Sequence, residues 1–483
     1  MIRTPTLVWE PVLPELILAA FAIVALLYEA FVARSSRTVH LAIALVGIAA
    51  ATVASLALWS WTGDPTVMGG MVAADRFSVL TRVVLLAVAA IGLLYGSHYF
   101  ARSGDEWRGE FFPLVLFATM GMTLITASAD LLMVFLALEI LSLSLYVLTG
   151  ITGRRNSNEA ALKYFLLGAA SSAFFLYGVA MAYGATDTTS ITAIANALAG
   201  RIGSQPLALL SFAFLAVGFM FKVSAAPFHM WTPDVYQGSP TPVTAYMSAA
   251  TKVAAFAALI RVLMVAFQPL TWDWTPAVIV LAALSVVIGS VLAIAQTDIK
   301  RMLAYSSVAQ AGFILMGLTN ATSTGIRAAL FYLVAYATMT VGAFGIVMLV
   351  SAKGEEQTSL SSYAGLYKRS PFLAALMTIF LLSLAGIPPT AGFIAKASVF
   401  AAAVSAGHWE LALLGVLTSV VAAFFYLRVI VLMYMQEPQG EQDEDDSVLP
   451  RVAVAIPAIL TIALGIFPGL IAGFIQQASI LRW

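Results

Sequence analysis

Apolar segments long enough to cross a lipid bilayer recur along the whole of this 483-residue chain. A helix needs about 20 such residues to span the hydrocarbon core. The segments cover residues 12–33, 39–61, 77–100, 111–128, 131–151, 158–184, 207–226, 243–268, 276–296, 301–320, 325–351, 371–405, 410–435 and 451–475. They lack the alternation of a lipid-facing β-strand, and only helices and closed barrels satisfy their backbone within lipid. The pattern therefore predicts an all-α integral membrane protein of about fourteen transmembrane helices.

Composition agrees with a membrane protein, because 61% of the residues are apolar and only 10% are charged. A soluble chain of this length needs far more polar surface. The chain has no cysteine, which excludes thiolate-bound iron–sulfur clusters, thiolate zinc sites and disulfides. We therefore expect no cofactor or metal in this chain, and any redox chemistry to take place elsewhere. Nothing in its zero net charge suggests a nucleic-acid partner.

The orientation follows from the loops, because cytoplasmic loops hold an excess of Lys and Arg. Loops after odd-numbered helices hold Arg34, Arg37, Arg102, Arg108, Arg154, Arg155, Lys300, Arg301, Lys353, Lys368 and Arg369. The loops of the opposite side hold Arg3, Arg76, Arg201, Arg327 and Arg482. This distribution predicts that both termini face away from the cytoplasm. The acidic stretch from Glu437 to Asp446 is interpreted as a solvated loop.

A constant offset of 168 residues aligns several separated stretches of the chain with one another. The matches are Asp130 with Asp298, 160–162 with 328–330, Tyr164 with Tyr332, 253–256 with 421–424, and Leu259 with Leu427. The offset corresponds to five helices, and an odd number reverses direction, so the pattern predicts two inverted five-helix repeats. The predicted divisions are a three-helix segment at 1–110, repeats at 111–268 and 276–435, and the acidic loop with the last helix at 436–483.

Lysines inside the apolar segments are the strongest functional signal, because an ionisable group at bilayer depth is costly and tends to mark a pathway. Lys163, Lys222, Lys252 and Lys396 lie in such segments, and Glu139 is the deeply buried acid that we expect to join them. Burial disfavours the charged form of lysine and a nearby carboxylate favours it, so a movable carboxylate can act as a switch. The alternative is that Glu139 and one lysine form a static ion pair that holds two helices together.

Proline interrupts two of the predicted helices beside these lysines. Pro227 follows Lys222 and cannot donate to the carbonyl four residues before it, which weakens the helix at 207–226. The segment at 371–405 contains Pro388 and Pro389 before Lys396, and it is too long for one continuous helix. Broken helices at bilayer depth are typical of transporter ion sites. His229 is a candidate proton relay between Lys222 and Lys252, or else a neutral histidine bonded in an interfacial loop.

These residues resemble the antiporter-like subunits of proton-pumping NADH:quinone oxidoreductase, respiratory complex I. The resemblance spans nearly the whole chain, and its most specific parts are residues 222–246 and 386–396. Within this family, lysine at position 396 and the chain length are closer to the subunit N type than to M or L. The resemblance implies fourteen helices, inverted repeats, interrupted helices 7 and 12, and a bacterial inner membrane.

The resemblance also implies roles and partners. Glu139 with Lys163 would be the modulating pair, Lys222 the central proton carrier, Lys252 the link to the second half, and Lys396 the exit group on the outer half. Protons would pass from cytoplasm to periplasm, driven by quinone reduction elsewhere in a complex that uses FMN, iron–sulfur clusters and quinone. Expected partners are the adjacent antiporter-like subunit M, the small subunit K, the lateral helix of subunit L, and lipids.

The second repeat departs from the first, because the offset places Ser307 opposite Glu139 and Phe331 opposite Lys163. We expect Ser306, Ser307, Gln310 and bound water to carry the path there. Two rival classes remain open. One is a subunit of a multisubunit sodium/proton antiporter, which could use the same lysines. The other is a structural membrane subunit with static ion pairs and no conduction.

Overall fold

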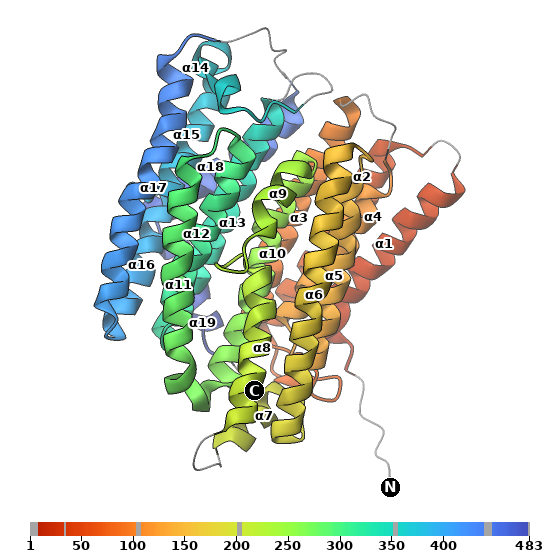
Figure 1. The fold of residues 1–483 in the computed structure, drawn as a ribbon. Coiled ribbons are helices and arrows are strands. Elements are labelled where there is room, and N and C mark those ends of the chain that lie inside the picture. Colours follow the sequence, from red (N-terminus) through yellow and green to blue (C-terminus); the bar gives the residue numbers. More distant parts are fainter. Residues whose placement is uncertain are drawn as a thin grey trace.

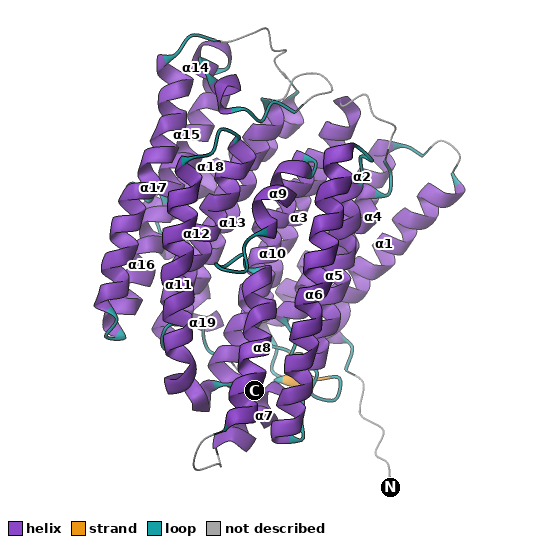
Figure 2. Cartoon of the chain, viewed as in Figure 1, coloured by secondary structure: helices purple, strands orange, loops and turns teal. Residues whose placement is uncertain are grey.

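The computed structural model describes residues 8–32, 35–102, 108–199, 205–350, 356–438 and 447–481, and almost all of their regular structure is helical (Figures 1 and 2). The helices in the first part of the chain are α1 Leu13–Phe31, α2 Arg37–Ala57, α3 Arg76–Arg102, α4 Phe111–Thr126, α5 Leu131–Gly150, α6 Arg155–Thr186, α7 Ile191–Ala199, α8 Pro206–Lys222, α9 Trp231–Gly238 and α10 Thr241–Arg261. Those in the second part are α11 Thr271–Ile294, α12 Ile299–Gly317, α13 Ser323–Leu349, α14 Leu366–Arg369, α15 Pro371–Ala385, α16 Ala391–Ser405, α17 Trp409–Met435, α18 Val448–Ile466 and α19 Gly469–Ala478.

Ten helices of the described ranges are long and apolar enough to cross a membrane, and α4, α8, α15 and α16 are shorter apolar helices. The chain is therefore a multi-pass membrane protein, as its composition predicted. Helix α12 also lies in a predicted window, although Ser306, Ser307 and Gln310 reduce its hydropathy. One hairpin of two-residue strands, β1 Thr66–Val67 and β2 Val72–Ala73, lies at the end of the bundle that also carries α7 (Figure 2).

Helix α10 forms the centre of the bundle, and every one of its residues is buried. It packs against α3 and α13, while α1, α2, α6, α11, α17 and α18 expose apolar side chains on the outside. A helix that is apolar all round is expected to be surrounded by other helices. Lys252 is in the middle of this central helix, so its ammonium group must find its partners within the protein.

Two buried ion pairs connect α1 to α3 and the start of α3 to this centre. Arg82 on α3 binds both carboxylate oxygens of Glu15 on α1, at 2.9 and 3.0 Å. Arg261 at the end of α10 binds both oxygens of Asp75 at 3.0 and 2.6 Å, and also the Thr126 carbonyl. Both arginines are fully buried. These charges have carboxylate partners with bidentate geometry, which is the arrangement that makes a buried arginine tolerable.

Equivalent contacts recur at the sequence offset, with the two aspartates 168 residues apart and their partners 169 residues apart. Asp130 begins α5 and accepts a hydrogen bond from Thr189, and Asp298 begins α12 and accepts one from Thr358. The backbone pairs Asp130 with Ser190, just before α7, and Asp298 with Ser359, shortly before α14. Figure 1 shows α7 and α14 at opposite ends of the bundle.

A pair of glycines follows the same offset. A Cβ at Gly121 on α4 would lie 2.7 Å from the Leu141 nitrogen on α5, and a Cβ at Gly289 on α11 would lie 2.4 Å from the Ala309 nitrogen on α12. The backbones of these two helix pairs thus approach closely at equivalent positions.

The chain ends its helical structure at Lys222 and resumes it at Trp231, and it does the same between Ala385 and Ala391. These breaks lie where the prolines predicted them. The acidic stretch lies outside the described residues apart from Glu437 and Pro438, and so do Arg3, Arg34, Arg201, Lys353 and Arg482.

Gly289→Ala tests the close approach of α11 and α12. The new methyl group would meet backbone atoms that cannot rotate away, so we expect the free energy of unfolding to fall by about 2 kcal/mol or more. Gly473→Ala on α19 is the matched control, because its Cβ meets nothing within 4 Å and alanine favours a helix. Thermal unfolding of the detergent-purified protein measures both. Equal stability of the two variants would contradict the packing described.

Candidate functional site

Lys222, the last residue of α8, is 3% exposed, and its ammonium makes direct contacts only with neutral groups, although the Glu139 carboxylate is near enough to interact with it electrostatically. It donates a hydrogen bond to the Ser142 hydroxyl on α5 at 2.7 Å. The rings of Tyr146, Tyr164 and Phe221 surround it at 5.6–5.7 Å from nitrogen to centroid. Aromatic faces and a hydroxyl stabilise a cation without neutralising it, so this lysine is held where its protonation can change.

Glu139 lies one turn before Ser142 on α5, and it is less buried than predicted. Its side chain is half-buried, at the border of an outer face that exposes Leu136 and Leu143. Its carboxylate accepts a short hydrogen bond from Ser172 on α6. The prediction of a deeply buried glutamate is therefore wrong for this chain alone. The most deeply buried acids among the described residues include Glu15 and Asp75, which the sequence did not single out.

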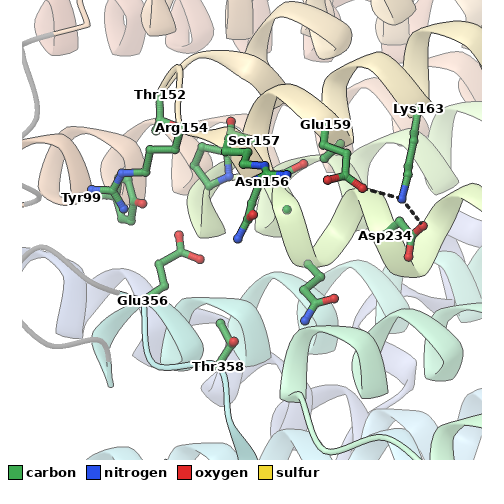
Figure 3. Close-up of a pocket in the computed structure, with 16 residues that line it drawn as sticks. Tyr99, Thr152, Arg154, Asn156, Ser157, Glu159, Lys163, Asp234, Glu356 and Thr358 are labelled. Atoms are coloured by element: carbon green, nitrogen blue, oxygen red, sulfur yellow. Dashed lines mark hydrogen bonds and ion pairs between the residues drawn. The ribbon is translucent and has the colours of Figure 1, made fainter.

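Lys163 is also less buried than predicted, with 43% of its side chain exposed. Its ammonium binds Glu159 and Asp234, each at 2.9 Å, and not Glu139 (Figure 3). Side chains on a helix lean toward its N-terminus. Helices α5 and α6 run in opposite directions, so Glu139 and Lys163 lean apart. Ser172, the partner of Glu139, is nine residues beyond Lys163, or about 13 Å along the helix.

A polar cavity of about 610 Å³ opens beside Lys163. Its lining includes Arg154, Arg155, Glu159, Asp234 and Glu356, from the loops and helix ends of both halves of the chain (Figure 3). The volume is ample for water, and its charged walls supply the partners that ordered water needs. Lys163 and Asp234 are therefore accessible to solvent from this end of the bundle.

Lys252 joins the central helix α10 to α12. It is 2% exposed and donates to the carbonyl and the hydroxyl of Ser307. The Ser307 hydroxyl is 2.8 Å from the Tyr336 hydroxyl on α13, which also bonds the Ser248 carbonyl. The Tyr336 ring lies 5.1 Å from the lysine nitrogen. The 168-residue offset matches Ser307 with Glu139, so Lys252 binds a hydroxyl at the position that the offset assigns to the glutamate.

The break between α15 and α16 supplies the next acceptors. In a continuous helix the carbonyls of Leu384 and Ala385 would accept the N–H groups of residues 388 and 389, but both are prolines and have none. The Leu384 carbonyl instead accepts from Gln310 at 3.1 Å. The Ala385 carbonyl accepts from Lys396 at 2.9 Å. Lys396 is 4% exposed, and its nitrogen lies 4.6 Å from the Phe313 ring centroid.

Gln310 and its neighbours make a hydrogen-bonded cluster between Lys252 and Lys396. The Tyr332 hydroxyl donates to the Gln310 side-chain oxygen, and the Gln310 nitrogen bonds the Tyr426 hydroxyl at 3.4 Å. The Tyr426 hydroxyl in turn bonds Ser306. Gln310 is one helical turn beyond Ser307, the partner of Lys252. Polar groups therefore follow one another from Lys252 to the carbonyls of the helix break.

His229 lies in the break between α8 and α9 and is 8% exposed. Its Nδ1 has no hydrogen-bond partner within the described part of the chain. The ring of Tyr305 on α12 lies near it, with 6.3 Å between centroids. Its predicted part as a relay between Lys222 and Lys252 stays a prediction.

Several charged residues of this region were not predicted as site residues. Asp234, Lys300, Arg301 and Glu356 meet at the cavity end of α9 and α12. In the sequence, Lys300 and Arg301 indicated only the orientation of the loops, and Asp234 belonged to the stretch after the first helix break. The sequence signal that could have identified Asp234 was its position just after the helix break that follows Lys222. The described residues contain no group of three or more His, Cys, Asp or Glu placed to hold a metal ion.

Glu356 follows α13 outside the membrane-spanning helices and binds the fully buried Lys300 at 2.8 Å. It also accepts the Thr241 N–H at 2.8 Å. Burial alone would raise the pKa of the Glu356 carboxyl, but the Lys300 ammonium and these hydrogen bonds hold the pKa below its usual range. The pair therefore joins α12 to the start of α10 at neutral pH.

Known proteins are similar in sequence to this chain over almost its whole length. A family model described as NADH:quinone oxidoreductase/Mrp antiporter, TM, matches residues 128–422. NADH-quinone oxidoreductase subunit N of Trichlorobacter lovleyi is 43% identical over 471 residues, which cover 97% of this chain and 96% of that protein.

Solved structures show the same likeness. A chain of respiratory complex I from Thermus thermophilus with bound aureothin is 38% identical, with a TM-score of 0.81 over 95% of this chain and 98% of that one. A chain of the Mrp complex from Dietzia sp. has a TM-score of 0.86 at 21% identity, covering 97% of each chain, and this likeness concerns the fold alone.

Stability should depend on pH through Glu356. Because its folded-state pKa is depressed, its contribution is present above the unfolded value of about 4.3 and is lost as the pH falls through the folded value. We expect Glu356→Gln to lower the free energy of unfolding by about 3 kcal/mol at pH 7, since it leaves Lys300 buried without a carboxylate partner. Thermal unfolding at several pH values between about 3 and 7 measures both. The variant should be less sensitive to acid than the wild type, and an unchanged pH profile would contradict the assignment.

Proposed function

This chain belongs to the subunit N family of NADH-quinone oxidoreductase, and from that premise we propose that it carries protons from cytoplasm to periplasm through Lys222, Lys252 and Lys396. Quinone reduction elsewhere in the complex would drive the transfer. FMN, iron–sulfur clusters and quinone would be held by other subunits. The path would combine these lysines with hydroxyl groups, carbonyls and bound water.

One observation carries this proposal. The three lysines are almost completely buried, yet within the described residues each binds only neutral oxygen atoms. A buried ammonium without a carboxylate partner is costly when charged, so it can release its proton at a modest cost. Lysine in such an environment suits reversible protonation.

Three other buried cations of the chain can be compared with these lysines. Arg82 binds Glu15, Arg261 binds Asp75, and Lys300 binds Glu356. These fully buried cations all have a carboxylate partner, as a group that serves only stability should. The difference between the two sets favours conduction over the alternative of a structural subunit with static ion pairs.

The second half of the path would run along α12. Lys252 binds Ser307, Gln310 is one turn away, and the adjacent carbonyls of Leu384 and Ala385 bind Gln310 and Lys396. A narrow void lies between Ser306, Ser307, Tyr336 and Leu384. In this proposal a proton passes from Lys252 to Lys396 through these groups and through water that enters when they separate. His229 would serve as a relay in the preceding step, between Lys222 and Lys252.

Control of the path would come from Glu139 and Lys163. Moving a carboxylate to about 4 Å from an ammonium is worth roughly 4 kcal/mol at an effective dielectric constant of about 20. That is enough to change the protonation of a buried lysine such as Lys222. Since Glu139 and Lys163 lean apart in this structure, their pairing would require both side chains to turn toward each other. The polar cavity beside Lys163 would supply protons and water from the cytoplasm.

The proposed topology is fourteen transmembrane segments with inverted repeats at 111–268 and 276–435, after an N-terminal segment at 1–110 and before a final segment at 436–483. The recurring Asp–Thr and glycine contacts, 168 or 169 residues apart, support it. Arg154, Arg155, Lys300 and Arg301 at the cavity end favour a cytoplasmic cavity and periplasmic termini. Other complex I subunits are its partners, and we propose subunits M and K and the lateral helix of L as neighbours, together with lipids.

A sodium/proton antiporter subunit is the second candidate, because the description of the matching family model names the Mrp antiporter as well as the oxidoreductase. It would predict transport that requires sodium and proceeds without NADH oxidation. The 43% identity to a subunit N protein over nearly the full length of both chains favours the first candidate.

Lys222→Met in the assembled complex tests the function. Methionine keeps the volume of the side chain but cannot carry a proton. We therefore expect the number of protons pumped per NADH to fall by the number that this subunit transfers. Lys368→Met is the matched control, because Lys368 is exposed and pairs with the exposed Glu437. Proton uptake and NADH oxidation by reconstituted vesicles give the ratio, with and without sodium. An unchanged ratio for Lys222→Met would refute the proposal, and a ratio that depends on sodium would favour the antiporter.

A further inference from the structure

The carboxylate of Asp234 on α9 binds one cation from each half of the chain. Its Oδ2 accepts from Lys163 on α6 at 2.9 Å, and its Oδ1 accepts from Arg301 on α12 at 2.6 Å. About a third of the Asp234 side chain is exposed, toward the polar cavity (Figure 3). A single acid thus binds the lysine proposed for control in the first half and the first turn of the helix that carries the path in the second half.

Gln237 strengthens the connection between α9 and α12. Its side-chain oxygen accepts from Arg301 at 3.0 Å, and its nitrogen donates to Asp298 at 3.0 Å. Asp298 is the residue that caps the start of α12. Both Asp234 and Gln237 lie on the same side of α9, three residues apart, so α9 holds the start of α12 with several polar contacts.

Helix α9 also contacts the surroundings of Lys222. Its first residue, Trp231, stacks on Tyr164 with 4.6 Å between ring centroids and donates to the Phe221 carbonyl at 2.9 Å. Tyr164 and Phe221 are two of the three rings around Lys222. This eight-residue helix therefore contacts Lys163, the surroundings of Lys222, and α12, and non-helical segments connect it on both sides.

We propose that Asp234 is the alternative partner of Lys163, holding it away from Glu139, and that through Arg301 it couples the position of Lys163 to that of α12. When Lys163 turns toward Glu139, Asp234 keeps Arg301 as its partner. The start of α12 and the short helix α9 then adjust together. Because α12 carries Ser307 and Gln310, this adjustment reaches Lys252 and the helix break. Asp234 is thus a positioning residue, and its proposed role rests on the proposed function.

The first measurement uses Asp234→Asn and its control Glu159→Gln in the assembled complex. Both substitutions remove one carboxylate that binds Lys163, but only Asp234 also binds Arg301. We expect Asp234→Asn to lose as many pumped protons per NADH as Lys222→Met, and Glu159→Gln to lose less. Asp234→Glu should restore part of the loss. Equal ratios for Asp234→Asn and the wild type would overturn the proposal.

Electron cryo-microscopy of the same complexes gives a readout independent of pumping. In Asp234→Asn the Lys163 side chain should turn toward Glu139, whereas in Glu159→Gln it should stay on Asp234. If the Lys163 side chain does not move in Asp234→Asn, the role proposed for Asp234 is overturned. This result does not depend on whether Lys222→Met pumps normally, so it is separate from a failure of the proton path. If Lys222→Met is impaired and Asp234→Asn is not, only the role of Asp234 fails.

Arg301→Gln separates the two contacts of Asp234. It leaves the Lys163 pair intact but removes the cation that connects it to α12. We expect Lys163 to stay on Asp234 while the pumping ratio falls, and the double variant with Asp234→Asn to lose no more than the worse single variant. Additive losses, or full pumping by Arg301→Gln, would overturn the coupling. The pumping ratio of Arg301→Gln still tests the coupling if Asp234→Asn does not assemble.

Discussion

A backbone carbonyl at bilayer depth has no water to bond, so it must find a donor within the protein. Two consecutive prolines after α15 remove the donors that the Leu384 and Ala385 carbonyls would otherwise have. Gln310 and Lys396 take their place. The helix break, the polar cluster of α12 and the position of Lys396 therefore depend on one another. A restored N–H at either position would compete with a side chain of the path for its acceptor.

The same requirement explains which charges are paired. Bidentate arginine–carboxylate contacts stabilise Arg82 and Arg261. The lysines at positions 222, 252 and 396 are left with hydroxyl groups, carbonyls and aromatic faces. In the proposed function, the cost of burying them is part of what would make them able to exchange protons. Under this proposal, stability and proton conduction would thus use different residues in the same bundle.

Much of the fold and part of the site could be predicted from residue types and spacing. Apolar windows predicted the helices, prolines predicted the two breaks, and intramembrane lysines were selected because their burial is unusual. The contact between Glu139 and Lys163 was not found, because counting residues gives depth but not the direction in which a side chain leans. Asp234 was missed because it lies in an eight-residue helix whose placement against α6 and α12 depends on the break before it.

The half-buried position of Glu139 has a consequence for biogenesis. The outer face of α5 beside it carries Leu132, Leu136, Leu143 and Val147, so a newly inserted chain presents a carboxylate next to a lipid-facing stripe. Such a group is costly until a neighbouring protein covers it. In an unassembled chain this carboxylate would therefore lie beside lipid rather than beside a partner. Covering this face of α5 during assembly would lower the free energy of the chain at Glu139 itself, in addition to burying the leucines beside it.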